Sequence, residues 1–171
     1  MREITYEEFR ARYLGIAESW MHMELRDSYL TVDEKPDFMR WQTTGTDDNG
    51  WMRPWLDNVR RLADEGKNLR RLKVVSTPVS EYHRWVHAGV PEIIAHGEET
   101  RWCDRKRVSH LAFPGNDFYV LDRKSVMFLH FAGDGPLNLF TVTEAPHVVQ
   151  LCLSAFESCW RLSTAHGDFR I

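Results

Sequence analysis

The stretch Arg71–Gly89, RLKVVSTPVSEYHRWVHAG, constrains the fold more than any other part of the chain. Its first residues, Leu72 to Val75, predict a strand. After them, Thr77 can cap a helix, and Pro78 suits the first helical position, where a missing N–H costs nothing. The stretch therefore predicts a strand, a short turn and a helix that begins at Pro78.

The rest of the chain alternates between helical and extended patterns. Thr5 and Glu8 have the spacing of a capping box, which predicts a helix that begins there and ends between Gly15 and Trp20. In the segment WMHMELRDSYLTV, apolar and polar residues alternate, which predicts a strand with one covered face. The other expected elements are a short helix over 33–41, a surface loop over 43–50, a helix over 51–62, a hairpin over 117–131, a turn over 133–136, a strand over 137–144 and a closing helix over 145–163.

These elements predict one domain over residues 1–171 with an α/β or α+β architecture. We expect a mixed, mostly antiparallel sheet with helices on both faces. The length suits a single hydrophobic core, and the content of 43% hydrophobic and 27% charged residues is typical of a globular chain rather than a disordered one.

The compartment is predicted to be the cytoplasm. No uninterrupted apolar run approaches the roughly 18 to 20 residues that a bilayer requires, and the N-terminal sequence MREITYEEFR is unlike a signal peptide. Cys152 and Cys159 lie about two helical turns apart, roughly 10 Å, which is too far for a disulfide. We therefore expect buried, reduced thiols.

The charge distribution argues against a general nucleic-acid binder, because the net charge is −3. Two local basic clusters are interpreted as solvated faces, with an anion site as the alternative: Arg60, Arg61, Lys67, Arg70, Arg71 and Lys73, and then Arg101, Arg105, Lys106 and Arg107. The chain also has seven tryptophans. Most should lie in the core, and a group of them beside a cleft would suit a flat or cationic ligand.

His83 and His87 are four residues apart and share one flank of the predicted helix, so both could reach one ligand. A zincin motif is excluded because Arg84 follows His83 where that motif requires Glu. A metal would need a third ligand, and His22, His96, His110 and Cys103 cannot be placed from the sequence. General acid–base catalysis and a purely structural role stay open, and no metal or cofactor is predicted.

Two further groups of polar residues have a structural and a functional interpretation. Ser76 and Thr77 follow a strand where backbone amides could hold an anion, although helix capping is favoured. Asp117, Asp122 and Asp134 flank the predicted hairpin and could provide an acid–base pair, although turn formation is favoured.

Three segments together carry a resemblance to a known family: MELRDSYLT, VVSTPVSEYHRW and NDFYVLDRKSVMFLHFAGDG. From about Phe9 to Trp160, the chain resembles the actinobacterial family of domains of unknown function that bears the number 6879. The matching positions are Glu24 and Arg26 in the first segment, Val74 to Tyr82 in the second, and the hairpin from Asp117 to Asp122 in the third.

The resemblance implies a cleft and a role. The cleft would be a ligand site built from Glu24, Arg26, Ser76, Ser80, Tyr82, Asp117 and Asp122. The alternative is a polar network that fixes strand pairing and caps the helix. Members are often encoded beside helix-turn-helix regulators, which implies a regulatory or accessory role. The C-terminal half is also faintly similar to the phospholipase D-like fold, but no histidine here is followed two positions later by Lys, as that chemistry requires.

Three functions remain open. The preferred one is a non-catalytic cytoplasmic regulatory or accessory protein that binds a small molecule or a protein partner, for example a helix-turn-helix regulator. The second is a small enzyme that tailors a specialised metabolite, with His83 or His87 as proton carrier and Arg26 as anion holder. The third is a nucleic-acid accessory factor that uses the two basic clusters. An oligomer could form through an exposed aromatic helix.

Overall fold

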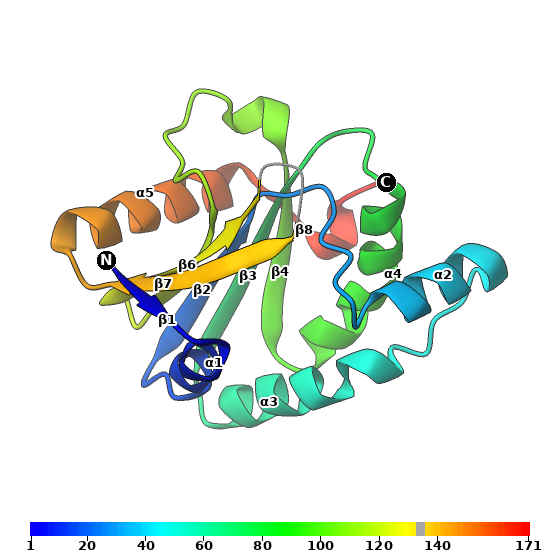
Figure 1. Cartoon of the computed structure of the whole chain (residues 1–171). Coiled ribbons are helices and arrows are strands. Elements are labelled where there is room, and N and C mark those ends of the chain that lie inside the picture. Colours follow the sequence, from blue (N-terminus) through cyan, green and yellow to red (C-terminus); the bar gives the residue numbers. More distant parts are fainter. Residues whose placement is uncertain (133–135) are drawn as a thin grey trace.

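Residues 1–132 and 136–171, which the computed structural model describes, form one eight-stranded mixed sheet with helices on both faces (Figure 1). The predicted α/β architecture is therefore confirmed. The predicted turn that begins at Gly133, and the candidate carboxylate Asp134, lie outside the described residues.

The strands pair in two modes. β2–β3 and β3–β4 are parallel, and the other neighbours are antiparallel. In the order in which they lie across the sheet, the strands are β1 (Arg2–Ile4), β7 (Leu137–Thr143), β6 (Ser125–Phe131), β5 (Asp117–Leu121), β2 (Ser19–Glu24), β3 (Asn68–Val75), β4 (Glu98–Asp104) and β8 (Thr164–Ala165).

Helices that connect the parallel strands lie on one face of the sheet, and the last helix lies on the other (Figure 1). The connections from β2 to β3 and from β3 to β4 run in the same direction across the sheet, so the right-handed rule places their helices on the same face. The helices are α1 (Tyr6–Leu14), α2 (Lys35–Thr44), α3 (Arg53–Asp64), α4 (Glu81–Ala95) and α5 (Pro146–Leu162).

The two faces have separate cores. On the α5 face, Met23 and Phe156 belong to one large apolar cluster. On the opposite face, α1 and α3 pack over the beginnings of β2 and β3, where Trp20 and Leu69 are buried. α4 packs over the end of β3, where Val75 is buried. The face of the sheet opposite α5 is therefore covered by α1 and α3 at one end and by α4 at the other.

The start of α4 differs from the prediction. The helix begins at Glu81, and Ser80 caps it by accepting a hydrogen bond from the His83 N–H at 3.1 Å. The Thr77 hydroxyl donates instead to Asp104 at 2.7 Å. The predicted start at Pro78 is wrong because a second cap residue, two positions after the proline, satisfies the first turn.

Other elements are confirmed with small shifts, and three strands were not predicted. Thr5 caps α1, with the Glu8 N–H donating to its hydroxyl at 3.2 Å. β2 is a strand, but it ends at Glu24 and is buried on both faces, so the prediction of one covered face is wrong. The missed strands are β1, β4 and β8. All three cysteines are buried and free, as expected.

Candidate ligand site

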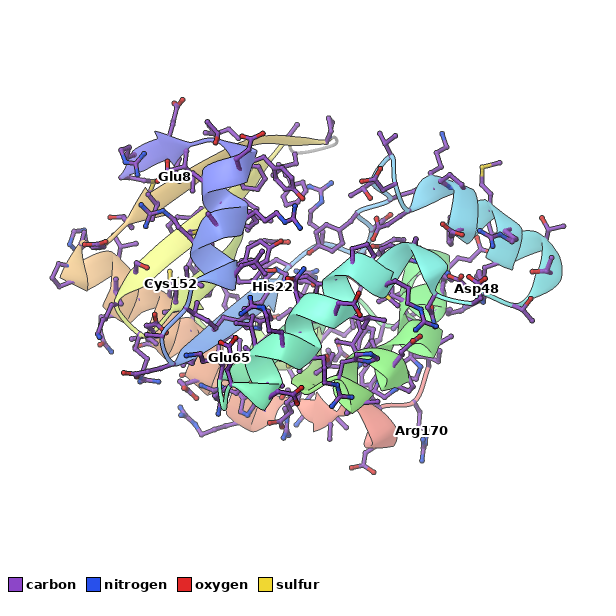
Figure 2. The ribbon with its side chains drawn as sticks, turned by 90° about the horizontal axis from the view of Figure 1, so that it is seen from below. Glu8, His22, Asp48, Glu65, Cys152 and Arg170 are labelled. Atoms are coloured by element: carbon purple, nitrogen blue, oxygen red, sulfur yellow. The ribbon has the colours of Figure 1, made fainter. Side chains whose placement is uncertain are left out.

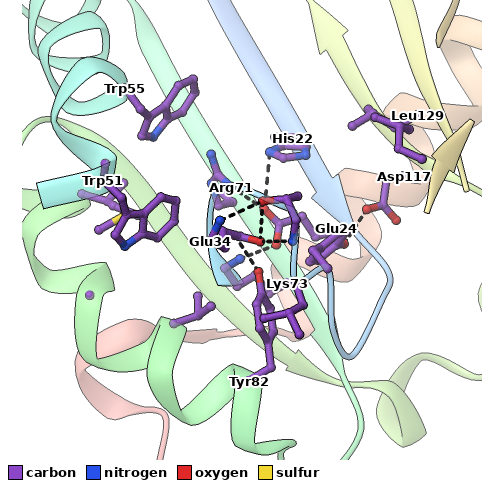
Figure 3. Close-up of a pocket in the computed structure, with 18 of the residues that line it drawn as sticks. His22, Glu24, Glu34, Trp51, Trp55, Arg71, Lys73, Tyr82, Asp117 and Leu129 are labelled. Atoms are coloured by element: carbon purple, nitrogen blue, oxygen red, sulfur yellow. Dashed lines mark hydrogen bonds and ion pairs between the residues drawn. The ribbon is translucent and has the colours of Figure 1, made fainter. Parts of the chain in front are cut away.

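A cavity of about 590 Å³ lies on the face of the sheet opposite α5, between the core under α1 and α3 and the core under α4 (Figure 3). Its lining comes from α1, β2, the segment after β2, the turn before α3, α3, β3, α4, β5 and β6, and the start of β7. Figure 2 shows His22 of β2 between α1 and α3. At the rim, Tyr6, Val32 and Leu137 have exposed side chains. The volume is that of a typical small-molecule site.

The floor of the cavity is a network of buried charges on β2 and β3. Glu24 accepts hydrogen bonds from Lys73 and from Arg71 (Figure 3). Arg71 also donates through Nε to Glu98 on β4, at 2.6 Å. The second Glu98 oxygen accepts from the Trp20 indole N–H at 3.1 Å. Two carboxylates and two cations thus balance one another.

The sheet register explains why these residues meet. In the parallel β2–β3 pair, Glu24 is opposite Lys73 and His22 is opposite Arg71. Residues directly opposite in neighbouring strands project from the same face, so four polar side chains gather on one patch of the sheet. The intervening residues, among them Met23 and Leu72, project into the α5 core.

The network fixes the charge states of its members. Burial alone would raise the pKa of Glu24, but Lys73 and Arg71 hold that pKa well below its usual value. Burial would lower the pKa of Arg71, but Glu98 and Glu24 raise it. For His22, burial and then Arg71 hold the pKa well below 6.5. The imidazole is therefore neutral near pH 7, whereas Glu24 and Arg71 are charged.

Aromatic rings form the walls. Trp51 on the turn before α3 stacks on Trp85 of α4, with ring centres 5.4 Å apart. Trp55 stacks on Trp20 at 5.4 Å and lies 5.4 Å from the Arg71 guanidinium. Figure 3 shows Trp51 and Trp55 on the same side of the charged floor. Such walls favour a flat ligand, because ring faces bind apolar and cationic groups.

The segment between β2 and α2 is held to the rest of the site by two carboxylates. Asp117 accepts from the Leu25 N–H at 2.9 Å and from the Tyr29 hydroxyl. Glu34 accepts from the Tyr82 hydroxyl at 2.9 Å. Burial, together with the nearby negative charge of Glu24, raises the pKa of Asp117 to about 6 despite the Tyr29 hydrogen bond.

Three of the residues predicted for the cleft do line this cavity: Glu24, Tyr82 and Asp117. Arg26 is not among the lining residues. It donates to the Ala132 carbonyl at 3.2 Å, and its guanidinium lies 4.7 Å from the ring centre of Phe131. The structure therefore brings three of the seven residues together, and their role as a ligand site stays a prediction.

Ser76, Ser80 and Asp122 have structural roles outside the cavity. Asp27 accepts from the Ser76 hydroxyl at 2.6 Å, and its carbonyl accepts from the Ser80 hydroxyl at 2.6 Å. Asp122, in the β5–β6 turn, accepts from three successive backbone N–H groups, those of residues 17–19, at 2.7 to 2.9 Å. The alternative of a polar network that fixes strands and caps a helix describes these residues.

The two histidines of α4 do not converge on the cavity. His83 is fully buried, and its ring centre lies 5.7 Å from that of Trp102 on β4. His87 lies 5.3 Å from Trp102 and 4.3 Å from His166 in the C-terminal segment. The apolar flank of α4, with Trp85 and Gly89, lines the cavity instead. The expectation that the histidines and the cleft form one site is therefore wrong, and a catalytic role for either histidine stays a prediction.

The sequence-based interpretation missed Arg71, Lys73 and Glu34 as site residues. Arg71 and Lys73 were grouped with a solvated basic face, yet their side chains are only 12% and 5% exposed. Their signal is the alternation of charged Arg71 and Lys73 with apolar Leu72 and Val74 within β3, which indicates a polar patch on one face. Within the described residues, no group of three or more His, Cys, Asp or Glu side chains is arranged to hold a metal ion.

A comparison with models of protein families gives a match over nearly the whole chain. The model of the family described as a domain of unknown function (DUF6879) matches residues 7–171. The chain belongs to this family. The resemblance seen in the sequence is therefore confirmed at the level of the DUF6879 family, whose matched region contains every cavity residue except Tyr6. No curated protein matches the chain. In the described part of this DUF6879 domain, none of the helices is long and apolar enough to cross a membrane.

Proposed function

We propose that this protein is a cytoplasmic regulatory or accessory protein that binds a small molecule in the aromatic cavity above β2, β3 and β5. The observation that carries the proposal is the combination of a cavity of about 590 Å³ with ring walls and a polar floor. Natural ligand sites combine a largely apolar surface with a few fixed polar groups in this way. A protein partner such as a helix-turn-helix regulator would then read the ligand-bound state.

The cavity is better suited to binding than to catalysis. Lys73, Arg71 and Glu24 already satisfy one another, so none is positioned as an unpaired base or nucleophile. The residues offered for the enzyme alternative, His83 and His87, lie on another flank of α4. Binding therefore explains the geometry with fewer assumptions than proton transfer does.

Nucleic-acid binding is not favoured by the basic clusters. Arg70 pairs with Glu157 at 2.7 Å, and Arg101 donates to the Ser163 carbonyl at 2.8 Å. Arg71 and Lys73 are buried in the floor of the cavity. Charges engaged in this way do not form the continuous exposed basic surface that phosphate binding needs. The actinobacterial origin and the phospholipase D-like relationship remain expectations from the resemblance.

A thermal-shift screen with a blocked cavity tests the proposal. A ligand at 100 times its Kd stabilises the folded protein by about 2.7 kcal/mol, which for a chain of this size raises Tm by roughly 5 to 10 °C. Leu129→Trp places a larger side chain in the cavity, and Leu151→Trp places the same side chain on the exposed surface of α5 as a matched control.

We expect any hit to stabilise the unmodified protein and Leu151→Trp equally, and to lose its effect on Leu129→Trp. A hit that stabilises both variants equally would place binding outside the cavity and refute the proposal. Both variants must first show cooperative unfolding without ligand.

A further inference from the structure

The carboxylates of the cavity outnumber its cations. Among the described lining residues, the acidic side chains are Glu24, Glu34 and Asp117, and the basic ones are Arg71 and Lys73. Both cations already form salt bridges: Lys73 pairs with Glu24, and Arg71 pairs with Glu24 and with Glu98. Within this network, two positive and two negative charges cancel. The negative charge of the other two carboxylates is left over.

Glu34 and Asp117 have only neutral hydrogen-bond partners in the described structure. Glu34 accepts from the Tyr82 hydroxyl at 2.9 Å and from the Thr31 N–H at 2.8 Å. Asp117 accepts from the Tyr29 hydroxyl and the Leu25 N–H. Among the residues described, no Lys, Arg or His lies within 4.0 Å of either carboxylate. These partners orient the carboxylates but do not neutralise them.

The two carboxylates flank a set of ring faces. The rings of Tyr29 and Tyr82, which donate to them, have centres 6.2 Å apart, and Phe131 lies 5.5 Å from Tyr29. A ring face attracts a cation within about 6 Å of its centre, and more strongly when water is excluded. A positive group beside the Tyr29 and Tyr82 rings would gain contacts with these ring faces and with the two carboxylates, whereas the Arg26 guanidinium already lies 4.7 Å from the centre of the Phe131 ring.

His22 offers a further polar contact. Its side chain is only 8% exposed, it lines the cavity, and its buried Nδ1 has no hydrogen-bond partner among the described residues. Its Nδ1 lies 3.6 Å from Glu24, beyond hydrogen-bond distance. A neutral imidazole presents one N–H and one unprotonated nitrogen, so it can accept a hydrogen bond from an ammonium group.

We propose that the cavity selects a flat organic cation, with an aromatic ring system between the tryptophan walls and an ammonium group directed toward Asp117 and Glu34. The inference rests on the proposed function, because it names the chemical class of the ligand for the same site. A carboxylate ligand is disfavoured, since Arg71 and Lys73 are paired and the remaining charge in the cavity is negative.

Matched probes test this selection. Tryptamine and phenethylamine carry the ammonium group, tryptophol and 2-phenylethanol replace it with a hydroxyl, and indole-3-propionate and 3-phenylpropionate carry a carboxylate. Calorimetric titration at pH 8 with the full chain is expected to rank the amines at least about tenfold tighter than the alcohols, and the carboxylates weakest.

Two variants locate the source of the selection. Asp117→Asn and Glu34→Gln each remove one negative charge and are expected to weaken amine binding about tenfold while changing alcohol binding less than about twofold. Asp64→Asn on α3, outside the cavity, changes the net charge equally and should alter neither. The second cavity variant keeps the test decisive if the first does not fold.

The outcomes separate this inference from the proposed function. Alcohols or carboxylates that bind as tightly as the amines would overturn the cation selection, while binding lost in Leu129→Trp would still support a ligand site. Amine binding that survives in both Asp117→Asn and Glu34→Gln would also overturn the inference. Failure of every probe to bind would overturn the cation selection, while the proposed function would still be decided by the thermal-shift screen.

Discussion

The unfolding free energy of the Asp117→Asn variant, relative to that of the unmodified protein, should increase as the pH rises. Asp117 is 2% exposed, and burial raises its pKa from 3.8 to about 6. Because the folded pKa is the higher one, the stability linked to this group is complete below the unfolded pKa and is lost as the pH rises through about 6. Ionised Asp117 therefore costs stability at neutral pH.

The magnitude follows from the shift. Raising a pKa from 3.8 to about 6 corresponds to about 3 kcal/mol of unfolding free energy between low and neutral pH, of which about 2 kcal/mol falls between pH 4.5 and 7.5. Asparagine keeps an oxygen that can accept the Leu25 N–H but cannot ionise. The stability difference, variant minus unmodified protein, should thus rise by about 2 kcal/mol over this pH range.

Urea unfolding followed by tryptophan fluorescence, at half-unit steps from pH 4.5 to 7.5, measures this difference. Taking the difference removes the contributions of distant titratable groups, whose shifts both chains share. Asp64→Asn provides a control that should give no pH-dependent difference. A flat difference for Asp117→Asn, or one that falls as the pH rises, would refute the assignment of a raised pKa to Asp117.

Two further predictions concern a buried salt bridge and a carboxylate that accepts backbone hydrogen bonds. Lys73→Met should lower the unfolding free energy by about 3–5 kcal/mol, because Glu24 keeps its charge and loses one of its two cations. Urea unfolding measures this loss. A variant as stable as the unmodified protein would contradict the buried network. Asp122→Ala should cost about 1–3 kcal/mol, because three N–H groups at the start of β2 lose their acceptor; Asp122→Asn, which keeps one oxygen, should cost less, and equal losses would contradict this reason.

Local patterns predicted those elements whose formation depends on their own residues. The capping box at Thr5, the β5–β6 hairpin and the apolar stripe of α5 all gave elements in the expected places. β4 was missed because charged residues interrupt it, and β1 and β8 because three-residue and two-residue edge strands contain no periodicity. The start of α4 was misplaced because Thr77 and Ser80 are both acceptable cap residues by type.

The candidate site was harder to predict because it depends on strand pairing. Arg71 and Lys73 look like part of a basic cluster until the parallel register sets them beside Glu24 and His22. The periodicity of α4 placed Trp85 and Gly89 on one flank correctly, but only the tertiary structure shows that this flank lines a cavity. The histidines on the other flank pack against Trp102, which lies on a strand that was not predicted.

The position of the charged network follows from how the helices cover the sheet. α1 and α3 bury the beginnings of β2 and β3, and α4 buries the end of β3, so the end of β2 and the middle of β3 face the cavity rather than a helix. At a position fully covered by a helix, apolar side chains would stabilise the fold as much as these ion pairs do, since burying ion pairs gives little net stability. Beside a cavity, Arg71, Lys73 and Glu24 form a polar floor. Together with Glu98, these residues carry no net charge. The charge that a ligand would meet is therefore set by Asp117 and Glu34, the two carboxylates with neutral partners.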